Sequence, residues 1–306
     1  MSIFIMMIGV AGSGKSFYAK ELAHDSNAII VSSDAIRGEL YGDENDQTHN
    51  AEVFEEVHRR ILTALKEGQN AIYDATNLSA KRRKAFLTQL PKGTLKQAVV
   101  VATDYDIIQQ QNAARERVVP SDVIKSMYLR MQMPRKSEGW DVISYIANGY
   151  NKSDLISVLQ PCIGFDQDNP HHSATLYDHM SRATDYVFCH AHEYNLTERE
   201  KAIVYIAALF HDIGKPACKT YKLWNGKIDS HAHYYGHADV GAYMIACLFN
   251  KVPSEDRYAW IIILELIQHH MDCYADEKWL EKIERTQGKK FRDMLELLHE
   301  GDKNGH

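Results

Sequence analysis

Two short stretches of the sequence carry side chains suited to chemistry. In "LFHDIGKPAC" (209–218), His211 and Asp212 stand side by side inside an apolar run. Two hundred residues earlier, the segment from Gly9 to Ser16 reads "GVAGSGKS", which fits the phosphate-binding pattern G-x-x-x-x-G-K-[ST]. Imidazole with carboxylate is a metal-binding combination, and the glycine loop binds phosphate. The chain therefore combines two different chemistries.

The glycine loop lies where such loops function, after the apolar segment "SIFIMMIG" and before a helical pattern. Its glycines let backbone N–H groups surround phosphates at a helix N-terminus. Lys15 then reaches the β- and γ-phosphates, and the Ser16 hydroxyl binds Mg²⁺. We expect ATP with Mg²⁺ to be bound by the loop residues Gly9, Gly12, Ser13, Gly14, Lys15 and Ser16.

The acceptor of the phosphoryl group is indicated by the segments after the next two predicted strands. Asp34 in "SSDAIR" follows a strand at the edge where α/β sheets bind ligands, and it can take a proton from a hydroxyl. It can equally be a helix N-cap. Arg37, one turn on, can hold an acceptor phosphate. Asp74 in "DATN" supports Mg²⁺ or the loop serine, and Asn77 is a candidate cap.

Two basic stretches follow these strands. Arg115 and Arg117 precede the helical pattern that begins at "PSD", where arginines can neutralise charge during phosphoryl transfer. The alternative is a solvated basic helix face. For the run "KRRK" (81–84) we prefer the solvated face to a nucleic-acid contact.

Further metal-ligand types surround the His–Asp pair along the second half. Three of the sixteen histidines lie before residue 60 and the other thirteen from His171 onward. Histidine and aspartate suit Mn²⁺, Fe²⁺, Ni²⁺, Co²⁺ or Zn²⁺, whereas the cysteines lack zinc-finger spacing. A single histidine in a helix is usually a packed group, but the set argues for a metal centre. The candidate ligands are His179, His211, Asp212, His237, His269 or His270, and Asp272 or Asp302. Lys215 can orient a phosphate or be an ordinary helix charge.

The pattern of elements divides the chain in two. In the first half, strand-like runs at 28–34, 70–76, 96–103 and 141–148 alternate with helical patterns at 15–23, 51–66, 80–90 and 120–131. This alternation predicts an α/β domain with a mostly parallel sheet covered by helices on both faces. The second half shows helical spacing and almost no strand signal, which predicts an all-α domain. We place the domains at 1–155 and 160–306.

Composition limits the classes of function. A net charge of −6 argues against binding duplex nucleic acid by bulk electrostatics. No run of 18 apolar residues exists, so we expect no membrane span, and the N-terminus is interpreted as a strand rather than a signal peptide. The five cysteines have no C-x-x-C and are interpreted as helical core residues in a reducing cytoplasm.

The first half resembles the kinase module of phage and bacterial polynucleotide 5′-kinases over residues 1–150. The resemblance rests on "GVAGSGKS", "SSDAIR", "YDATNLS" and "NAARERVVPSDVIKSMY". It implies transfer of the ATP γ-phosphate to a 5′-hydroxyl, with Asp34 as base and Arg37 on the acceptor's 3′ phosphate. It also implies lid arginines at Arg115 and Arg117. Gln111 stands where such kinases commonly have the first arginine of R-N-x-x-R, so Arg115 is the firmer assignment.

The second half resembles the HD superfamily of metal-dependent phosphohydrolases, from His172 to Asp302. The segments "NPHHSATLYDH", "ALFHDIGKP" and "GHADVGA" look most like the HD domains of CCA-adding enzymes, which act on 2′,3′-cyclic and 2′-phosphate ends. The resemblance implies metal-activated water attacking phosphorus. It favours His270 over His269 and Asp302 over Asp272 as ligands, and it places His172 at the pocket.

Together the two resemblances imply repair of RNA or DNA ends: phosphorylation of a 5′-hydroxyl and removal of a 2′,3′-cyclic, 2′- or 3′-phosphate. A polynucleotide ligase would act downstream, in the cytoplasm, or in the host cytoplasm if the chain is phage-encoded. One alternative is a nucleoside or sugar kinase fused to a nucleotide phosphohydrolase. A non-enzymatic sensor is a weaker alternative, because a sensor needs neither a base nor activated water.

Overall fold

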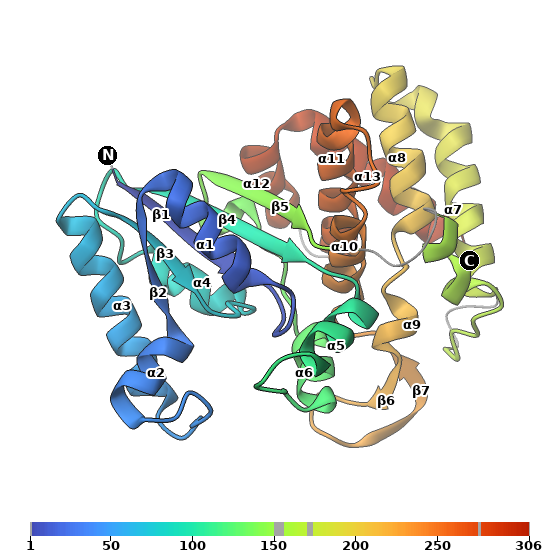
Figure 1. The fold of residues 1–306 in the computed structure, drawn as a ribbon. Helices are drawn as coiled ribbons and strands as arrows, with labels where there is room; N and C mark the ends of the chain where they lie inside the picture. Colours follow the sequence, from blue (N-terminus) through green and yellow to red (C-terminus); the bar gives the residue numbers. More distant parts are fainter. Residues whose placement is uncertain (1, 150–155, 170–173, 275–276, 306) are drawn as a thin grey trace. The chain divides into compact units, whose positions relative to one another are not determined.

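A computed structural model describes residues 2–149, 156–169, 174–274 and 277–305. The chain divides into two compact units, Met1–Asn148 and Gly149–His306 (Figure 1). Each unit is built around its own set of elements and is described separately. The domain limits of 155 and 160 stay a prediction, and His172 lies outside the described residues.

The first unit contains a five-stranded sheet in which every neighbouring pair of strands is parallel. Its order is β2-β3-β1-β4-β5, so β1 lies at the centre and its end delivers the glycine loop. Strands buried on both sides favour β-branched and apolar residues, as in "IFIMMI" and "AVVVA". The strands are β1 (Ile3–Ile8), β2 (Ala28–Ser32), β3 (Asn70–Asp74), β4 (Leu95–Ala102) and β5 (Val142–Ala147).

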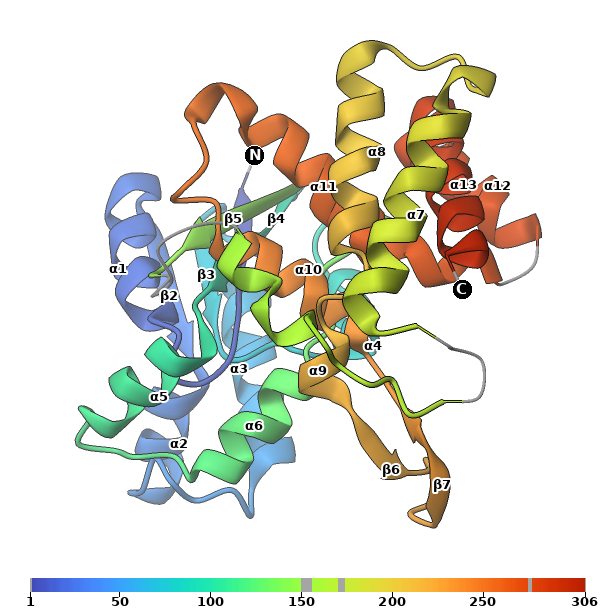
Figure 2. The same cartoon turned by 90° about the vertical axis from the view of Figure 1, so that its right-hand side faces the viewer.

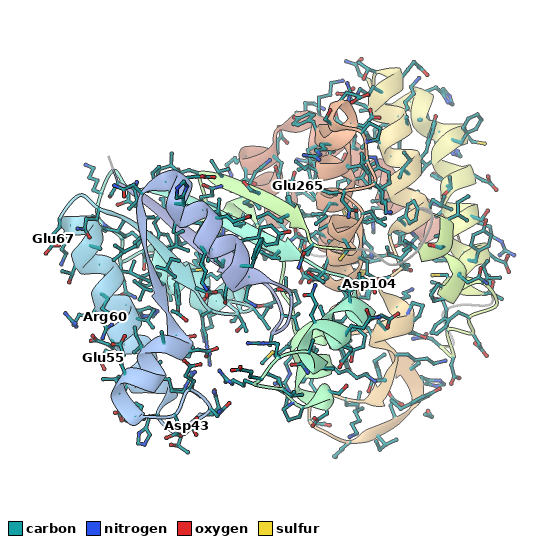
Figure 3. The ribbon with its side chains drawn as sticks, viewed as in Figure 1. Asp43, Glu55, Arg60, Glu67, Asp104 and Glu265 are labelled. Atoms are coloured by element: carbon teal, nitrogen blue, oxygen red, sulfur yellow. The ribbon has the colours of Figure 1, made fainter. Side chains whose placement is uncertain are left out.

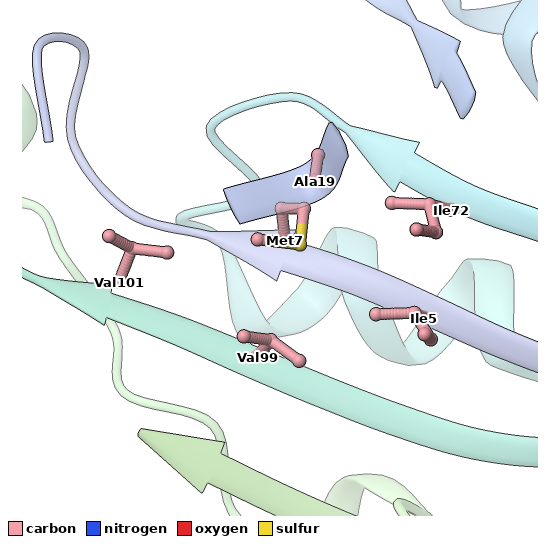
Figure 4. Close-up of a cluster of buried hydrophobic side chains, with 6 residues drawn as sticks. All are labelled: Ile5, Met7, Ala19, Ile72, Val99 and Val101. Carbon is pink, nitrogen blue, oxygen red and sulfur yellow. The ribbon is translucent and has the colours of Figure 1, made fainter. Parts of the chain in front are cut away.

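Apolar side chains of the central strands form a buried core. Ile5 and Met7 of β1 lie against Ile72 of β3 and Val99 of β4, and Val101 and Ala19 complete the cluster (Figure 4). Ala19 belongs to the helix that follows the glycine loop, so burying this core fixes that helix against the sheet. The core thereby holds the loop at the end of β1.

Helices connect the strands and confirm the alternation seen in the sequence, with two additions. The helices are α1 (Lys15–Ser26), α2 (Ser33–Tyr41), α3 (Asn50–Lys66), α4 (Ala80–Leu87), α5 (Tyr105–Ala113) and α6 (Ser121–Leu129). α2 and α5 are not among the helices expected from the sequence. On α3, Arg60 contacts Glu56 at 2.7 Å and reaches Glu39 of α2 at 2.6 Å (Figure 3). This ion pair ties the two helices together at the surface.

The second unit is mainly helical, as the sequence predicts. Its α-helices are α7 (Leu176–His190), α8 (Glu198–Phe210), α9 (Lys215–Cys218), α10 (His237–Cys247), α11 (Arg257–His269), α12 (Glu277–Gln287) and α13 (Lys289–Asn304). α13 packs against α7 and α8, and α11 packs against α8 and α10. Gly301 permits the first contact, since a Cβ there would lie 2.7 Å from a methyl of Val187. The packing brings residues more than a hundred positions apart into one centre.

A two-stranded antiparallel hairpin in the second unit departs from the expectation of an all-helical half. β6 (Thr220–Lys222) and β7 (Ile228–His233) join α9 to α10 and project beyond the helices of the unit (Figure 2). The strands are short and mostly polar, so they carry no apolar run. No helix among the described residues is long and apolar enough to cross a membrane.

The cysteine expectation is only partly right. All five cysteines are free, and Cys162, Cys218 and Cys247 are buried. Cys189 is instead exposed, because it lies on the outer side of α7. Cys162 and Cys273 lie in short 3₁₀ turns rather than α-helices.

Candidate active sites

Six buried side chains from five parts of the helical unit meet in one centre. His179 lies on α7, His211 caps the C-terminal end of α8 and Asp212 follows in the turn. His237 begins α10, His270 begins the 3₁₀ turn His270–Tyr274, and Asp302 lies near the end of α13. Because α8 stops at Phe210, His211 and Asp212 both face the centre although they are adjacent in the sequence.

The six residues form two overlapping groups that share Asp212. In the first group, His179 Nε2 lies 3.2 Å from His211 Nε2, 3.4 Å from Asp212 Oδ2 and 3.1 Å from Asp302 Oδ1. In the second, His237 Nε2 lies 3.1 Å from both His270 Nε2 and Asp212 Oδ1. Each carboxylate oxygen of Asp212 thus serves a different group.

Backbone carbonyls fix the orientation of the four histidine rings. The Nδ1 of His211, His237 and His270 each lies 2.7 Å from a carbonyl oxygen, of Ala208, Tyr234 and Ile267 respectively. His179 Nδ1 lies 3.2 Å from the Gly305 carbonyl. A carbonyl only accepts, so Nδ1 carries the proton and donates, and Nε2 presents its lone pair to the centre.

This arrangement suits cations. Facing Nε2 lone pairs at 3.1 and 3.2 Å repel one another unless a positive charge lies between them. Asp212 Oδ1 is buried and receives no hydrogen bond from the described residues. Burial opposes protonation of His211, but Asp212 and Asp302 outweigh it and raise its pKa to about 10, so the two carboxylates favour a positive charge at this Nε2, either a proton or a bound cation. The donor set of imidazoles and carboxylates therefore fits divalent transition metals.

Lys215 lies at the edge of the centre, next to Asp212. It is buried at the start of α9, and its Nζ lies 2.6 Å from Asp212 Oδ2. It also donates at 2.9 Å to Oε1 of Gln167, whose Nε2 is buried without a hydrogen-bond partner among the described residues. Burial opposes ionisation of Asp212, yet Lys215 and His211 hold the pKa of this carboxyl well below its usual range. Lys215 is thus a buried cation aligned beside the ligands.

Gly214, two residues after Asp212, lies where the backbone of α10 leaves no room for a side chain. A Cβ at Gly214 would lie 2.1 Å from the carbonyl oxygen of His237. The turn after Asp212 and the first turn of α10 therefore approach as closely as backbone allows. Only glycine permits His237 to reach Asp212.

In the first unit, the glycine loop has the conformation that its sequence predicts. Gly12 and Gly14 have φ of 85° and 88°, values that L side chains rarely adopt. The carbonyl of Ser13 accepts hydrogen bonds from Thr103 Oγ1 at 2.9 Å and from Asn148 Nδ2 at 2.8 Å. The residues directly after β4 and β5 thereby hold the loop in place.

Lys15 is folded back onto the loop. Its Nζ donates to the Val10 carbonyl at 2.8 Å, and burial lowers its pKa to about 8. Asp74 and Asp34 counteract the lowering and Arg115 adds to it, so all three are near enough to influence the ammonium. Gly9, Ser13 and Ser16 accompany it in the loop, with Ser13 buried and Ser16 exposed. A phosphate in place of the carbonyl would stabilise the charged form.

Asp34 lies between two arginines. Its Oδ1 is 2.7 Å from Arg37 and its Oδ2 is 3.0 Å from Arg117. It is not the N-cap of α2, because Ser32 holds that position and accepts from Ala35 N. Arg37 is 2% exposed and also donates to Asn50 Oδ1 at 3.0 Å. Its Nε is buried without a hydrogen-bond partner among the described residues.

A cleft of 780 Å³ connects the loop with these charged groups. Lys15 and Ser16 line it together with Asp34, Arg37, Asp74, Arg115, Arg117 and Gln111. The lining places two carboxylates and four arginines, Arg82 among them, in the same cleft as the phosphate loop. This is the arrangement needed to bring a hydroxyl acceptor to a bound triphosphate.

Several residues that the sequence singled out lie outside the two sites or in roles other than those predicted. Asn77 is no cap: its φ is 50° and its amide donates to the Met7 carbonyl at 2.8 Å. His269 and Asp272 pair with each other at 2.6 Å, outside both ligand groups. The solvated face expected for "KRRK" holds for three of its residues, but Arg83 is buried. It pairs with Glu138 at 2.7 and 2.8 Å, because the turn Lys136–Glu138 packs beneath α4.

Comparison with known families assigns both units. Residues 4–134 match the model of the AAA domain family, and residues 176–295 match that of the HD domain family. The chain joins an AAA-type P-loop domain to an HD domain. The predicted fold class, an α/β P-loop kinase domain followed by a helical HD domain, is confirmed, with the hairpin as an addition within the HD domain.

Several solved structures are similar to part of this chain at low identity. One chain of the Pnkp1/Rnl/Hen1 RNA repair complex is 20% identical, with a TM-score of 0.39, over 42% of this chain and 43% of that one. A sugar kinase from Janibacter sp. HTCC2649 is 16% identical (TM-score 0.38), over 47% and 86%. A putative kinase from Chloroflexus aurantiacus is 16% identical (TM-score 0.40), over 52% and 95%. The match thus spans less than half of the repair-complex chain.

Sequence reasoning missed several residues that support the HD centre. Gln167 holds Lys215, and Tyr274 donates to Asp302 Oδ2 at 3.0 Å. The Gly305 carbonyl orients His179. Tyr274 lies four residues after His270 and could have been considered on spacing alone, whereas nothing in the local sequence distinguishes Gln167.

Proposed function

We propose that the protein repairs nucleic-acid ends. The P-loop domain transfers the ATP γ-phosphate to a 5′-hydroxyl, and the HD domain removes a 2′,3′-cyclic, 2′- or 3′-phosphate from the other end. The products, a 5′-phosphate and a free 3′-hydroxyl, are the ends that a polynucleotide ligase joins. The five free cysteines support a cytoplasmic site of action.

The observation that carries this proposal is the charge on the acceptor side of the cleft. The glycine loop and Lys15 already provide for the triphosphate. Arg37, with its unpartnered buried Nε, and Arg117 lie on the other side, around Asp34. Arginine binds phosphate bidentately. An acceptor held by Arg37 itself carries phosphate, as a polynucleotide end does and a free sugar or nucleoside does not, and Arg117 is left for the transferring group.

The residues of the P-loop domain divide the phosphoryl transfer among them. Asp34 accepts the proton of the 5′-hydroxyl. At the same time the hydroxyl oxygen bonds to the γ-phosphorus, and the bond between the γ-phosphorus and the bridging β-phosphate oxygen breaks. Arg37 holds the acceptor's own phosphate, while Arg115 and Arg117 stabilise the charge on the transferring group. Lys15 and Ser16 hold ATP with Mg²⁺, and Asp74, buried at the end of β3, supports the metal side.

In the HD domain, His179, His211, Asp212 and Asp302 would hold one divalent cation, and Asp212, His237 and His270 a second. Such a cation, when bound, supplies Lewis acidity and a water of lowered pKa. The protein's own contribution is orientation: the backbone carbonyls fix each Nε2, and Tyr274 fixes Asp302. Lys215 places a positive charge beside the centre, where it orients and neutralises the phosphate that is hydrolysed.

One substrate tests both activities: an RNA oligonucleotide with a 5′-hydroxyl and a 2′,3′-cyclic phosphate. It is incubated with ATP, Mg²⁺ and Mn²⁺, Ni²⁺ or Co²⁺, and both ends are resolved by mass. We expect Lys15→Ala to abolish only the 5′ reaction and Asp212→Ala only the 3′ reaction. Lys66→Ala and Asp185→Ala, at exposed charged residues of α3 and α7 outside the two sites, are the matched controls.

The proposal is wrong if neither end changes while free nucleosides or mononucleotides are turned over. That outcome would instead support a metabolic kinase fused to a nucleotide phosphohydrolase. A DNA oligonucleotide with a 5′-hydroxyl and a 3′-phosphate, run in parallel, measures the preference between RNA and DNA.

A further inference from the structure

The hairpin of the HD domain is attached directly to the metal-binding centre. β6 follows α9, whose first residue is Lys215, and β7 leads into α10, whose first residue is the ligand His237. The hairpin itself supplies no ligand, and it projects beyond the helices of its domain (Figure 2). The hairpin thus connects two elements that carry residues of the centre, and its own role is something other than metal binding.

Three rings line up along this hairpin. The Trp224 ring lies 4.3 Å from that of Tyr235, and the Tyr235 ring lies 5.3 Å from that of His233 and parallel to it within 2°. We call these three residues the aromatic ladder. Trp224 is 84% exposed, more than any other large hydrophobic side chain in the part of the chain that the structure describes. Leaving so much apolar surface in water marks a contact site.

The ladder is held in place by the segment 165–169. The Asp168 carbonyl accepts from Ala232 N at 2.9 Å, and Asn169 Nδ2 donates to the Ala232 carbonyl at 3.3 Å. Tyr221 donates to the Asp168 carboxylate, and Tyr234 donates to the Gln167 carbonyl. Through Gln167, which holds Lys215, the same segment reaches the metal-binding centre. The ladder and the centre are therefore parts of one framework.

Two exposed lysines flank Trp224 at the turn of the hairpin. Lys222 and Lys227 are exposed on the two sides of the hairpin turn, and Lys219 lies at its base. Asp166, Asp168 and Asp229 lie near the hairpin, and Lys219 donates to the Asp166 carbonyl at 2.8 Å, so the exposed cations beside Trp224 are Lys222 and Lys227. Exposed aromatic faces next to lysines are what proteins use to bind single-stranded nucleic acid, with bases stacked on rings and phosphates near cations.

We propose that the aromatic ladder is a stacking platform for the bases of a single strand whose terminal phosphate lies in the HD centre. Tyr235 and His237 are two residues apart, so their backbones are separated by no more than about 7 Å. The ladder is thus joined to the centre by a short stretch of backbone, within reach of the nucleotides next to the reacting phosphate. The inference rests on the proposed end-repair function, and it specifies the substrate of the HD domain as a polynucleotide strand rather than a mononucleotide.

The test compares two substrates with the full-length protein and its metals: a pentanucleotide with a 2′,3′-cyclic end and a mononucleoside 2′,3′-cyclic phosphate. Loss of one stacked base predicts that Trp224→Ala raises KM for the pentanucleotide by about 5- to 150-fold. Its kcat stays near that of the wild type, and the mononucleotide, too short to occupy the ladder, is hydrolysed as before. Trp224→Phe retains a ring and restores most of the affinity. Trp279→Ala, which removes an exposed tryptophan of α12, is the control.

Binding without hydrolysis separates this proposal from the function on which it rests. A pentanucleotide with a 3′-hydroxyl, added without ATP, should quench tryptophan fluorescence in the wild type and much less in Trp224→Phe. If both ends of RNA are repaired but Trp224→Ala leaves KM unchanged, or affects both substrates equally, the platform is refuted and end repair stands. Self-association that disappears in Trp224→Ala would also overturn it, by identifying a second copy as the occupant.

Discussion

Replacing Asp212 by asparagine tests whether one carboxylate serves both halves of the HD centre. Its Oδ2 lies 3.3 and 3.4 Å from the Nε2 atoms of His211 and His179, and its Oδ1 lies 3.1 Å from that of His237. An amide keeps the shape but replaces one oxygen by NH₂, which has no lone pair to offer. One ligand group therefore loses its shared donor, and the other retains a neutral oxygen.

The magnitude follows from the charge removed. Two unit charges 4 Å apart at an effective dielectric constant of 20 interact by about 4 kcal/mol, and a divalent ion by about twice that. The amide dipole returns part of this, so we expect a loss of about 4 kcal/mol, or about a thousandfold in affinity. Asp302→Asn touches only the first group and should leave the second able to bind.

The assay is metal content after dialysis against buffered Mn²⁺, measured by inductively coupled plasma mass spectrometry, with thermal unfolding as a second readout. Asp212→Asn should retain little metal and show no metal-dependent rise in Tm, whereas Asp302→Asn should retain an intermediate amount. Asp229→Asn, at an aspartate that pairs with His233 outside the centre, should match the wild type. Full metal occupancy in Asp212→Asn would refute the shared-ligand reasoning.

Three more predictions follow from single contacts. Because burial lowers the pKa of Lys15 to about 8 and phosphate favours its charged form, ATP affinity should be constant below about pH 7 and fall up to tenfold per pH unit above 8. Calorimetric titrations in buffers of different ionisation heat should show proton uptake above pH 8, and a flat profile would contradict this. Arg83→Met leaves Glu138 buried and unpaired, so the first unit should lose about 3–5 kcal/mol of stability. Hydrogen exchange should rise in residues 2–148 but not in 174–305; Lys84→Met should change neither, and uniform acceleration would show that the units unfold together. Gln167→Leu should lower HD turnover by about 10- to 100-fold at unchanged metal content, with Gln167→Glu retaining more. Equal turnover in Gln167→Leu and the wild type would show that Lys215 needs no such support.

Much of this architecture is visible in the sequence because it depends on local patterns. Alternating apolar runs gave the five strands, and the loop "GVAGSGKS" marked the end of the central one. The hairpin was missed although "WNGK" contains Asn-Gly, the dipeptide typical of hairpin turns, and Gly226 has a φ of 82°. Its strands are three and six residues long and polar, so an apolar pattern could not reveal them.

The candidate sites likewise combine residues visible in the sequence with supporting contacts that only the fold supplies. Residue type pointed to His179, His211, Asp212 and His237, and the family resemblance chose His270 and Asp302 over His269 and Asp272; these six residues meet in the HD centre. What holds them is not written in any motif: the carbonyls that orient each Nδ1 are backbone atoms, and Gln167 reaches Lys215 across 48 residues. Arg83 shows the reverse error, since a basic run looks solvated until tertiary packing supplies a buried partner such as Glu138. Long-range contacts of this kind follow from the fold alone.

The hydrogen bond between His179 and the Gly305 carbonyl also bears on the order in which the two sites form during synthesis. This contact spans 126 residues, and Asp302 joins the same centre from α13. During synthesis the HD centre cannot close until residues 302–305 have left the ribosome. Every residue that lines the P-loop cleft lies between Ala11 and Met127, so that cleft can form while the helical half is still being made. A nascent chain would therefore complete the P-loop cleft before the HD centre.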